Sequence, residues 1–162
     1  MTNLNHLLSP LFLDEKEIKK LIELLFFSYR EFTIGPDKVL EKIEFGRTHH
    51  KIIYFIGKQK KITIKELLKI LQIPKQSLSR TLNQLVKKKY IILTAGTDKR
   101  TKILSLTQKG IDLEKELSTI QITRIRNILK KANENEINGF KKILYAMIDS
   151  EGKKIFNSMN NT

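Results

Sequence analysis

Apolar residues recur at helical spacing over most of the chain. From Asp14 to Phe32 they fall at i, i+3, i+4, i+7, i+8 and i+11, a stripe that predicts one amphipathic helix. Leu24 and Phe27 widen the stripe beyond a single contact surface, which indicates a subunit interface. Gly35-Pro36 is expected to end this helix. Further helices are predicted over residues 48–56, with Gly57 closing the segment, over 107–132 and over 134–156.

Two shorter helices in the middle of the chain form a helix-turn-helix candidate. The first opens with Thr63-Ile-Lys-Glu66, whose hydroxyl and carboxylate have the spacing of a capping box. Gln72-Ile73-Pro74 breaks the pattern, and proline is tolerated at a helix start because it lacks an N–H. The second helix is therefore predicted over 75–88, with Leu78, Leu82, Leu85 and Val86 on its buried side.

Two β-prone runs follow, at 90–94 and 102–106, around a basic turn. Short strands separated by such a turn predict a hairpin with a long basic tip. The expected order is helix, helix, helix-turn-helix, hairpin, helix, helix. This order predicts a mainly α fold with one small β-hairpin.

The net charge of +14 lies in residues 46–110. This stretch holds 16 Lys and Arg against two acids, Glu66 and Asp98, whereas the flanking residues together are neutral. Clustered cations without counter-charge favour a polyanion, most often nucleic acid. A lysine-rich composition would also raise the pI, but it would not leave the flanks neutral. The lysines expected to neutralise phosphates are Lys58, Lys60, Lys61, Lys75, Lys87, Lys88, Lys89 and Lys99.

The outer face of the second short helix has the chemistry to read DNA bases. It is polar and basic and carries no carboxylate. Arg pairs bidentately with guanine and Asn or Gln with adenine, from a helix lying in the major groove. The predicted DNA-binding residues of this recognition helix are Lys75, Gln76, Ser77, Ser79, Arg80, Asn83, Gln84 and Lys87. The alternative is an ordinary solvated face, although such faces usually mix acids and bases.

The hairpin carries the most specific pattern, Asp98-x-Arg100-x5-Leu106-Thr107-x-x-Gly110. It resembles the wing signature of the MarR family of bacterial transcription regulators, and the element order resembles that family over the whole chain. The resemblance implies that Arg100 enters the minor groove, that Asp98 shapes the wing tip and that Leu106 packs on the core. Thr107 is a plausible N-cap. The wing residues expected to bind DNA are Asp98, Lys99, Arg100, Thr101 and Lys102.

The resemblance also implies an architecture, a winged helix-turn-helix with dimerisation helices at both ends. Residues 1–45 would be the N-terminal dimerisation segment, 46–110 the DNA-binding domain and 111–162 the C-terminal dimerisation helices. A two-fold homodimer presents two recognition helices to an inverted-repeat operator in double-stranded DNA. The sequence departs from the family where a glycine commonly replaces Lys89 or Tyr90, so the turn after the recognition helix is expected to differ in shape.

The implied function is a sequence-specific transcription regulator, most commonly a repressor released by a small-molecule effector. By analogy the effector cleft would lie between the dimerisation helices and the winged domain, with Phe26, Tyr29, His49 and His50 as candidate lining. An ordinary, partly buried histidine is an equally good interpretation of His49 or His50. The alternative function is an architectural protein that binds DNA without sequence preference.

The sequence predicts neither an enzyme nor a cofactor or metal site. It has no glycine-rich phosphate loop, no nucleophile with a plausible base and no cysteine. His49 and His50 are adjacent and point to different sides of a helix, and His6 is remote from both, so zinc would need scattered ligands. There is no apolar run long enough for a membrane span and no signal peptide at the N-terminus, so a cytoplasmic location is expected.

Overall fold

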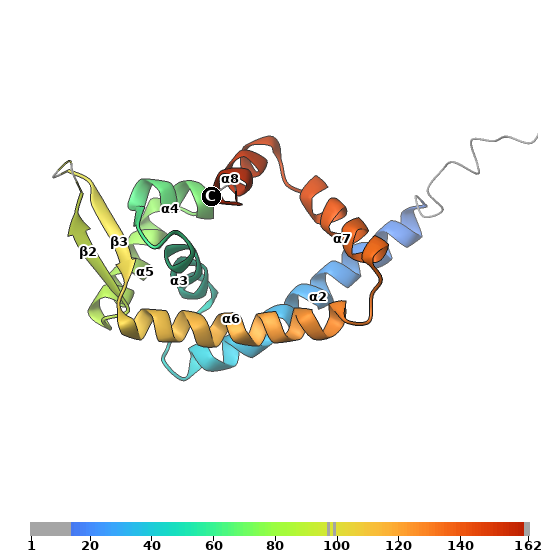
Figure 1. Ribbon diagram of the computed structural model, residues 1–162, viewed down its shortest axis with the longest axis horizontal. Helices are drawn as coiled ribbons and strands as arrows, with labels where there is room; N and C mark the ends of the chain where they lie inside the picture. Colours follow the sequence, from blue (N-terminus) through green and yellow to red (C-terminus); the bar gives the residue numbers. More distant parts are fainter. Residues whose placement is uncertain (1–13, 97, 99, 161–162) are drawn as a thin grey trace, which may run out of the picture.

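The computed structural model describes residues 14–96, 98 and 100–160, which form helices and a small sheet that lies at one end of the molecule (Figure 1). The N-terminal segment predicted not to be a signal peptide, His6 within it, and the wing residue Lys99 lie outside the described residues. The predicted mainly α, winged helix-turn-helix fold is confirmed. Its elements are α2 (Glu15–Glu41), α3 (Arg47–Gln59), β1 (Ile62–Thr63), α4 (Ile64–Leu71), α5 (Lys75–Lys87), β2 (Ile91–Ala95), β3 (Lys102–Leu106), α6 (Gln108–Leu129), α7 (Glu134–Ala146) and α8 (Ser150–Asn160).

The helix-turn-helix forms as the sequence predicted. Thr63 Oγ1 accepts from the N–H of Glu66 at 3.2 Å, and the Glu66 carboxylate accepts from the N–H of Thr63 at 2.8 Å. The hydrogen bonds from the Thr63 side chain and backbone lower the pKa of Glu66. Gln72 ends α4 in a left-handed conformation, with φ of 49°, and Pro74 precedes α5 directly. These two caps set the short turn that orients α5 against α4.

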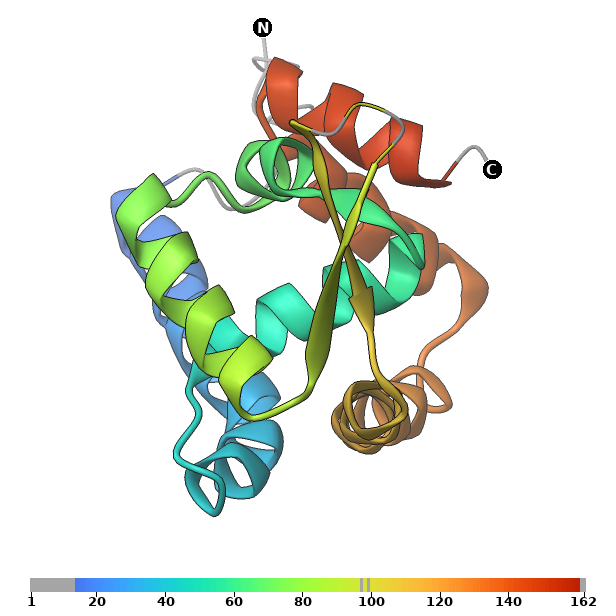
Figure 2. The ribbon, with the colours of Figure 1, turned by 90° about the vertical axis from the view of Figure 1, so that its left-hand side faces the viewer.

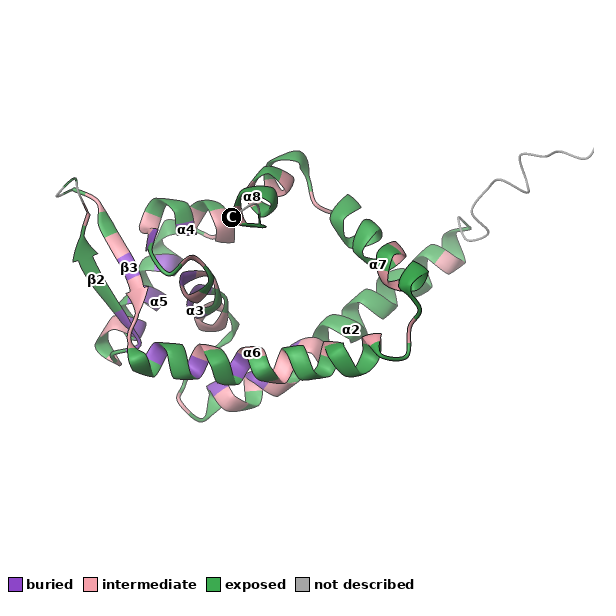
Figure 3. Ribbon diagram, in the orientation of Figure 1, coloured by how far each residue is buried: buried purple, intermediate pink, exposed green. Residues whose placement is uncertain are grey.

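The hydrophobic core belongs to the middle of the chain. Its members are contributed by α3, α4, α5, the sheet and the start of α6, together with the end of α2 (Figure 3). Side chains such as Ile52, Leu67 and Leu85 are fully buried. By contrast, α7 and α8 contribute no buried residue among those described. The core therefore extends from the winged-helix segment into the end of α2 and the first half of α6, whereas α7 leaves large apolar side chains such as Phe140 and Ile143 exposed.

The sheet has one more strand than the sequence predicted. β1 pairs antiparallel with β3, with Ile62 opposite Leu104, and β2 pairs with the other edge of β3, with Ile91 opposite Leu106. Only two residues form β1, so no alternating pattern marked it in the sequence. The strand ties the start of α4 to the hairpin. The hairpin strands themselves lie within one residue of their predicted positions.

The prediction that Gly35-Pro36 ends the first helix is wrong. α2 continues through both residues to Glu41, with Pro36 and Leu40 buried. A Cβ at position 35 would lie 2.6 Å from Ile120 Cγ2, so the glycine lets α6 pack closely at this point. An interior proline costs about 3 kcal/mol, and burial of the following turn against α6 and the core offsets this. Tertiary packing has overridden a local stop signal.

The expectation that Gly57 closes the next helix is also wrong. α3 begins at Arg47 and runs past Gly57 to Gln59. A Cβ on Gly57 would lie 3.1 Å from Glu114 Cγ and 3.2 Å from Leu106 Cδ1. The glycine is therefore a packing position where α3 meets α6 and β3, not a helix terminator.

The single helix predicted over 134–156 is two helices. α7 ends at Ala146, and α8 starts after Asp149, whose Oδ1 accepts from the N–H of Gly152 at 2.6 Å. The break turns the chain so that α8 lies beside α4, where Glu151 pairs with Lys69 at 3.2 Å (Figure 1). Asp149 is thus the N-cap of α8, because its side chain accepts from the N–H three residues later. The continuous helical spacing of the apolar residues concealed this N-cap in the sequence. Among the described residues, no helix has the length and apolarity to cross a membrane.

The turn after α5 accommodates a residue that lacks the conformational freedom of glycine. The N–H of Lys89 donates to Val86 O and that of Tyr90 to Leu85 O, both at 2.9 Å. This pair of bonds is a Schellman motif, in which the residue after the C-cap is left-handed and usually glycine. Lys89 occupies that place with φ of 62°. Lys89 thus adopts, at the expense of backbone strain, the left-handed conformation that glycine adopts without it.

Replacing Lys89 by glycine should stabilise the protein by about 0.5–1 kcal/mol, because the gain from relieved strain exceeds the extra entropy of the unfolded chain. Lys89→Ala removes the same charge but keeps the Cβ, so it should change stability by less than about 0.5 kcal/mol. Urea unfolding of both variants gives the comparison. Equal stabilities for the two variants would show that the left-handed conformation carries no strain.

Candidate nucleic-acid interface

Helix α5, predicted from the sequence to be the recognition helix, and the β2–β3 hairpin lie on the same side of the molecule (Figure 2). Leu78, Leu82 and Leu85 face the core, as the sequence predicted, and Val86 is half-buried. Every residue proposed from the sequence to bind DNA from this helix is exposed: Lys75, Gln76, Ser77, Ser79, Arg80, Asn83, Gln84 and Lys87. The outer face of α5 is thus a continuous polar and basic surface.

One of these side chains is held by a residue from another helix. His49 Nε2 lies 2.7 Å from Gln84 Oε1, and the His49 ring stacks on Phe45 with centroids 4.3 Å apart. Its other ring nitrogen, Nδ1, accepts from the N–H of Gly46 at 3.1 Å. The pKa of His49 is lowered, mainly by burial, so the neutral imidazole is favoured. Because Nδ1 is the acceptor, Nε2 carries the proton and donates to Gln84.

The wing tip is held by a single carboxylate. Asp98 Oδ1 accepts from the N–H of Arg100 at 2.9 Å, and Asp98 O accepts from the N–H of Thr101 at 2.8 Å. The N–H of Gly96 donates to Thr101 O and closes the loop onto the strand ends. This is the geometry that the resemblance implied for Asp98. Arg100 is exposed at the tip, and Lys102 is exposed at the start of β3.

The end of the hairpin is locked to α6 at Thr107 and Gly110. Thr107 Oγ1 accepts from the N–H of Gly110 at 3.1 Å, which confirms the predicted N-cap, and donates to Lys89 O at 2.7 Å. A Cβ on Gly110 would overlap the carbonyl oxygen of Tyr90. Leu106 packs against the core cluster as expected. The Leu106-Thr107-x-x-Gly110 pattern therefore fixes where the wing leaves the helical body.

Two lysines counted from the sequence as phosphate ligands are engaged elsewhere. Lys88 Nζ donates to Ile43 O at 2.7 Å and to Glu44 Oε2 at 2.9 Å. The hydrogen bond and charge of Lys88 lower the pKa of Glu44. Lys58 Nζ donates to Asn160 Oδ1 at 2.6 Å. Lys88 thus fastens the loop before α3 to the end of α5, a role that sequence spacing gave no means of finding.

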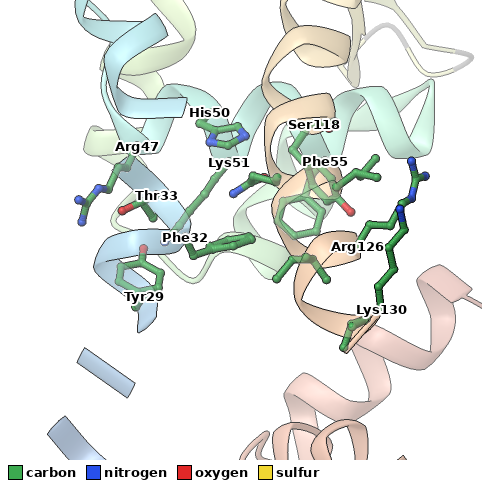
Figure 4. Close-up of a pocket in the computed structure, with 15 residues that line it drawn as sticks. Tyr29, Phe32, Thr33, Arg47, His50, Lys51, Phe55, Ser118, Arg126 and Lys130 are labelled. Atoms are coloured by element: carbon green, nitrogen blue, oxygen red, sulfur yellow. The ribbon is translucent and has the colours of Figure 1, made fainter. Parts of the chain in front are cut away.

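A cavity of about 890 Å³ lies between α2, α3 and α6 (Figure 4). Phe32, Phe55 and Ile125 give it an apolar lining, and Arg47, Lys51, Arg126 and Lys130 add four cations. No acidic residue is among the described residues that line it. Arg47 also pairs with Asp37 at 2.8 Å on α2, so this cation is partly neutralised.

The four residues expected at an effector cleft do not come together. Tyr29 and His50 line the cavity, whereas Phe26 is 71% exposed on α2 and does not line it. His49 faces α5 instead, beside Arg80 and Gln84. The neighbouring histidines thus point to different sides of α3, as their spacing predicted. Within the described part of the chain, no three His, Asp or Glu side chains gather as a metal site.

Comparison with known sequences gives a family and a curated relative. The sequence profile of the MarR family matches residues 45–101. The chain is 40% identical over 140 residues to the HTH-type transcriptional regulator PetP of Rhodobacter capsulatus, covering 86% of this chain and 84% of that protein.

Solved structures share the fold at lower identity. FabT of Streptococcus pneumoniae, solved in complex with DNA, superposes with a TM-score of 0.73 at 22% identity, covering 80% of this chain and 94% of FabT. NadR in complex with 4-hydroxyphenylacetate gives a TM-score of 0.65 at 20% identity, covering 77% of this chain and 91% of NadR. At these identities the likeness concerns the fold.

Proposed function

The chain belongs to the MarR family, and from this premise we propose that it is a transcription regulator that binds double-stranded DNA sequence-specifically. The observation that carries the proposal is the shared orientation of α5 and the wing, both exposed on one side of the segment that holds the net charge (Figure 2). Arg80, Asn83 and Gln84 offer donors and acceptors for base edges, and Arg100 offers a cation for the minor groove. The proposed partner is therefore the DNA of the cell. In a bacterial cell this DNA lies in the cytoplasm, which is where we propose that the protein acts.

The protein is a homodimer in this proposal. α2 exposes Leu24 at 59% and Phe26 at 71%, and α7 exposes Ile143 at 64%. Apolar faces of this extent usually mark an interaction surface. Residues 1–45 and 111–162 would form the dimer, and 46–110 the DNA-binding domain. Two-fold symmetry then presents two copies of α5 to an inverted-repeat operator.

A small-molecule effector would occupy the cavity between α2, α3 and α6 and release the protein, acting as a repressor, from its operator. The lining favours an organic anion, because it combines apolar side chains with the cations Lys51, Arg126 and Lys130, and with Arg47, which Asp37 partly neutralises. NadR, which shares the fold, was crystallised with 4-hydroxyphenylacetate, an organic anion of this kind. Tyr29 and His50 supply polar groups that would orient such a ligand.

Selection of bound sequences from a random DNA library tests the proposed function. The expected product is an inverted repeat whose half-sites are centred about 34 Å, or one helical turn, apart. A single half-site would contradict the dimer. Recovery of the library without any enriched sequence would instead support an architectural protein.

Arg80→Ala should weaken operator binding by about 1–3 kcal/mol and relax the preference at one position of each half-site. Arg100→Ala should weaken binding most for operators with A·T-rich flanks, where the narrow minor groove concentrates negative potential. Both side chains are exposed, so thermal melting should change little. Affinities for the selected operator and for a scrambled duplex give the measurement. Equal losses on both duplexes for Arg80→Ala would mean that α5 contacts only the backbone.

A further inference from the structure

The outer face of α5 carries the residues proposed to contact DNA. Within the described chain, Gln84 is the one residue of this face whose side chain is hydrogen-bonded to a different helix. The bond from His49 comes across from the first turn of α3. His49 itself is fixed twice more, by the Gly46 N–H on Nδ1 and by stacking on Phe45. A long, flexible side chain on an exposed helix face is thereby held in one orientation before DNA arrives.

The direction of this bond decides which part of Gln84 remains available. Since His49 donates, it must meet the amide oxygen of Gln84 and not the amide nitrogen. The amide NH2 of Gln84 is then the end left to make new hydrogen bonds. An NH2 group pairs with acceptors in the major groove, which are purine N7, guanine O6 and thymine O4.

We propose that His49 is a positioning residue for sequence readout, holding Gln84 so that its amide NH2 selects a base edge that carries an acceptor. The inference rests on the proposed function, because it requires α5 to lie in the major groove. His49 touches no base in this arrangement. It acts by excluding the other rotamers of Gln84 and the orientation with its amide flipped. Without this restraint, Gln84 could form hydrogen bonds with the edge of any base.

The arrangement depends on the neutral imidazole. The charged groups around His49 are Glu44 and Lys88, which pair with each other, and Arg47 and Arg80. Asp37 on α2 neutralises Arg47. A proton on Nδ1 would face the Gly46 N–H, donor against donor, in a locally cationic setting. Burial and, to a smaller extent, Lys88 lower the pKa of His49, so the neutral form persists below the ordinary imidazole pKa and is lost only as the pH falls through the lowered pKa.

Three substitutions separate positioning from a structural role. His49→Asn places a short amide where Nδ1 was, so it keeps an acceptor for the Gly46 N–H but cannot reach Gln84. His49→Gln places an amide near the position of Nε2, so it keeps a donor for Gln84 but does not titrate. Gln84→Ala removes the residue that is positioned. Each variant is tested as the full-length protein, by library selection and by its affinities for operators that differ at the base pair that Gln84 is proposed to contact.

We expect His49→Asn to reduce discrimination at one position per half-site by about fivefold, the worth of one hydrogen bond, with the other positions unchanged. His49→Gln should restore it. Lowering the pH from 8 through the lowered pKa of His49 should erase the preference in the native protein but not in His49→Gln. In a Gln84→Ala background, His49→Asn should have no further effect on discrimination.

The inference is overturned if His49→Asn keeps the native preference at every position, or if it weakens all duplexes equally. A preference that is as pH-dependent in His49→Gln as in the native protein would also overturn it. These results leave the proposed function intact, since the native protein would still select an operator. Failure of the proposed function is distinguishable, because the native protein would then enrich no sequence at all.

Discussion

Raising the salt concentration from 50 to 200 mM should weaken operator binding on the order of a thousandfold, if the protein contacts about six phosphates. Each cation that neutralises a phosphate releases condensed counterions, so the logarithm of the affinity falls linearly with the logarithm of salt concentration. Exposed cations lie along the whole side that we propose faces DNA, from Lys75 and Lys87 on α5 to Arg100 and Lys102 on the wing. Titration of operator DNA at several salt concentrations gives the slope.

Lys87 and Lys88 provide a matched pair for this measurement. Lys87 is exposed on α5, whereas the Nζ of Lys88 is engaged by Ile43 O and Glu44. Lys87→Gln should lower the salt slope by about two in a dimer, one phosphate for each protomer. Lys88→Gln should leave the slope unchanged while reducing thermal stability. A salt-insensitive interaction, or an equal loss of slope in both variants, would contradict this account of the charge.

Replacing Gly110 by alanine should destabilise the protein by about 3 kcal/mol or more, lowering Tm by about 10 °C at fixed protein concentration. The added Cβ would overlap Tyr90 O, a backbone atom that cannot rotate away, and would also press on Leu106. Tyr90 O accepts from the N–H of Thr107, so relief requires the hairpin to move off the start of α6. We therefore expect the wing to lose its place and DNA affinity to fall with stability.

Gly46→Ala is the control for this substitution. No atom lies within 4 Å of a Cβ at Gly46, and its backbone is extended, so any residue fits. The expected change is below about 1 kcal/mol, reflecting only the lower N-cap preference of alanine. Similar melting temperatures for Gly110→Ala and Gly46→Ala would show that the hairpin adapts to the extra methyl group.

The sequence alone determined the features that depend on neighbouring residues and on composition. The Thr63–Glu66 capping box, the Pro74 start of α5 and the Thr107 N-cap form where local spacing predicted them. Apolar periodicity also assigned the buried side of α5, and charge clustering marked residues 46–110. Such features could be predicted because a cap or an amphipathic face involves residues only a few positions apart.

The tertiary structure decided what local signals contradicted or did not contain. Gly35-Pro36 and Gly57 are helix breakers in the sequence, yet both lie inside helices because close packing against α6 outweighs their intrinsic cost. The tertiary structure also decided which side chains meet at the proposed DNA-binding surface. His49 was expected at the cavity with His50, but neighbours on a helix diverge, and the fold brings His49 to Gln84 across 35 positions of sequence. Contacts of this kind exist only once α3 and α5 share a core, so their energy leaves no local pattern in the chain.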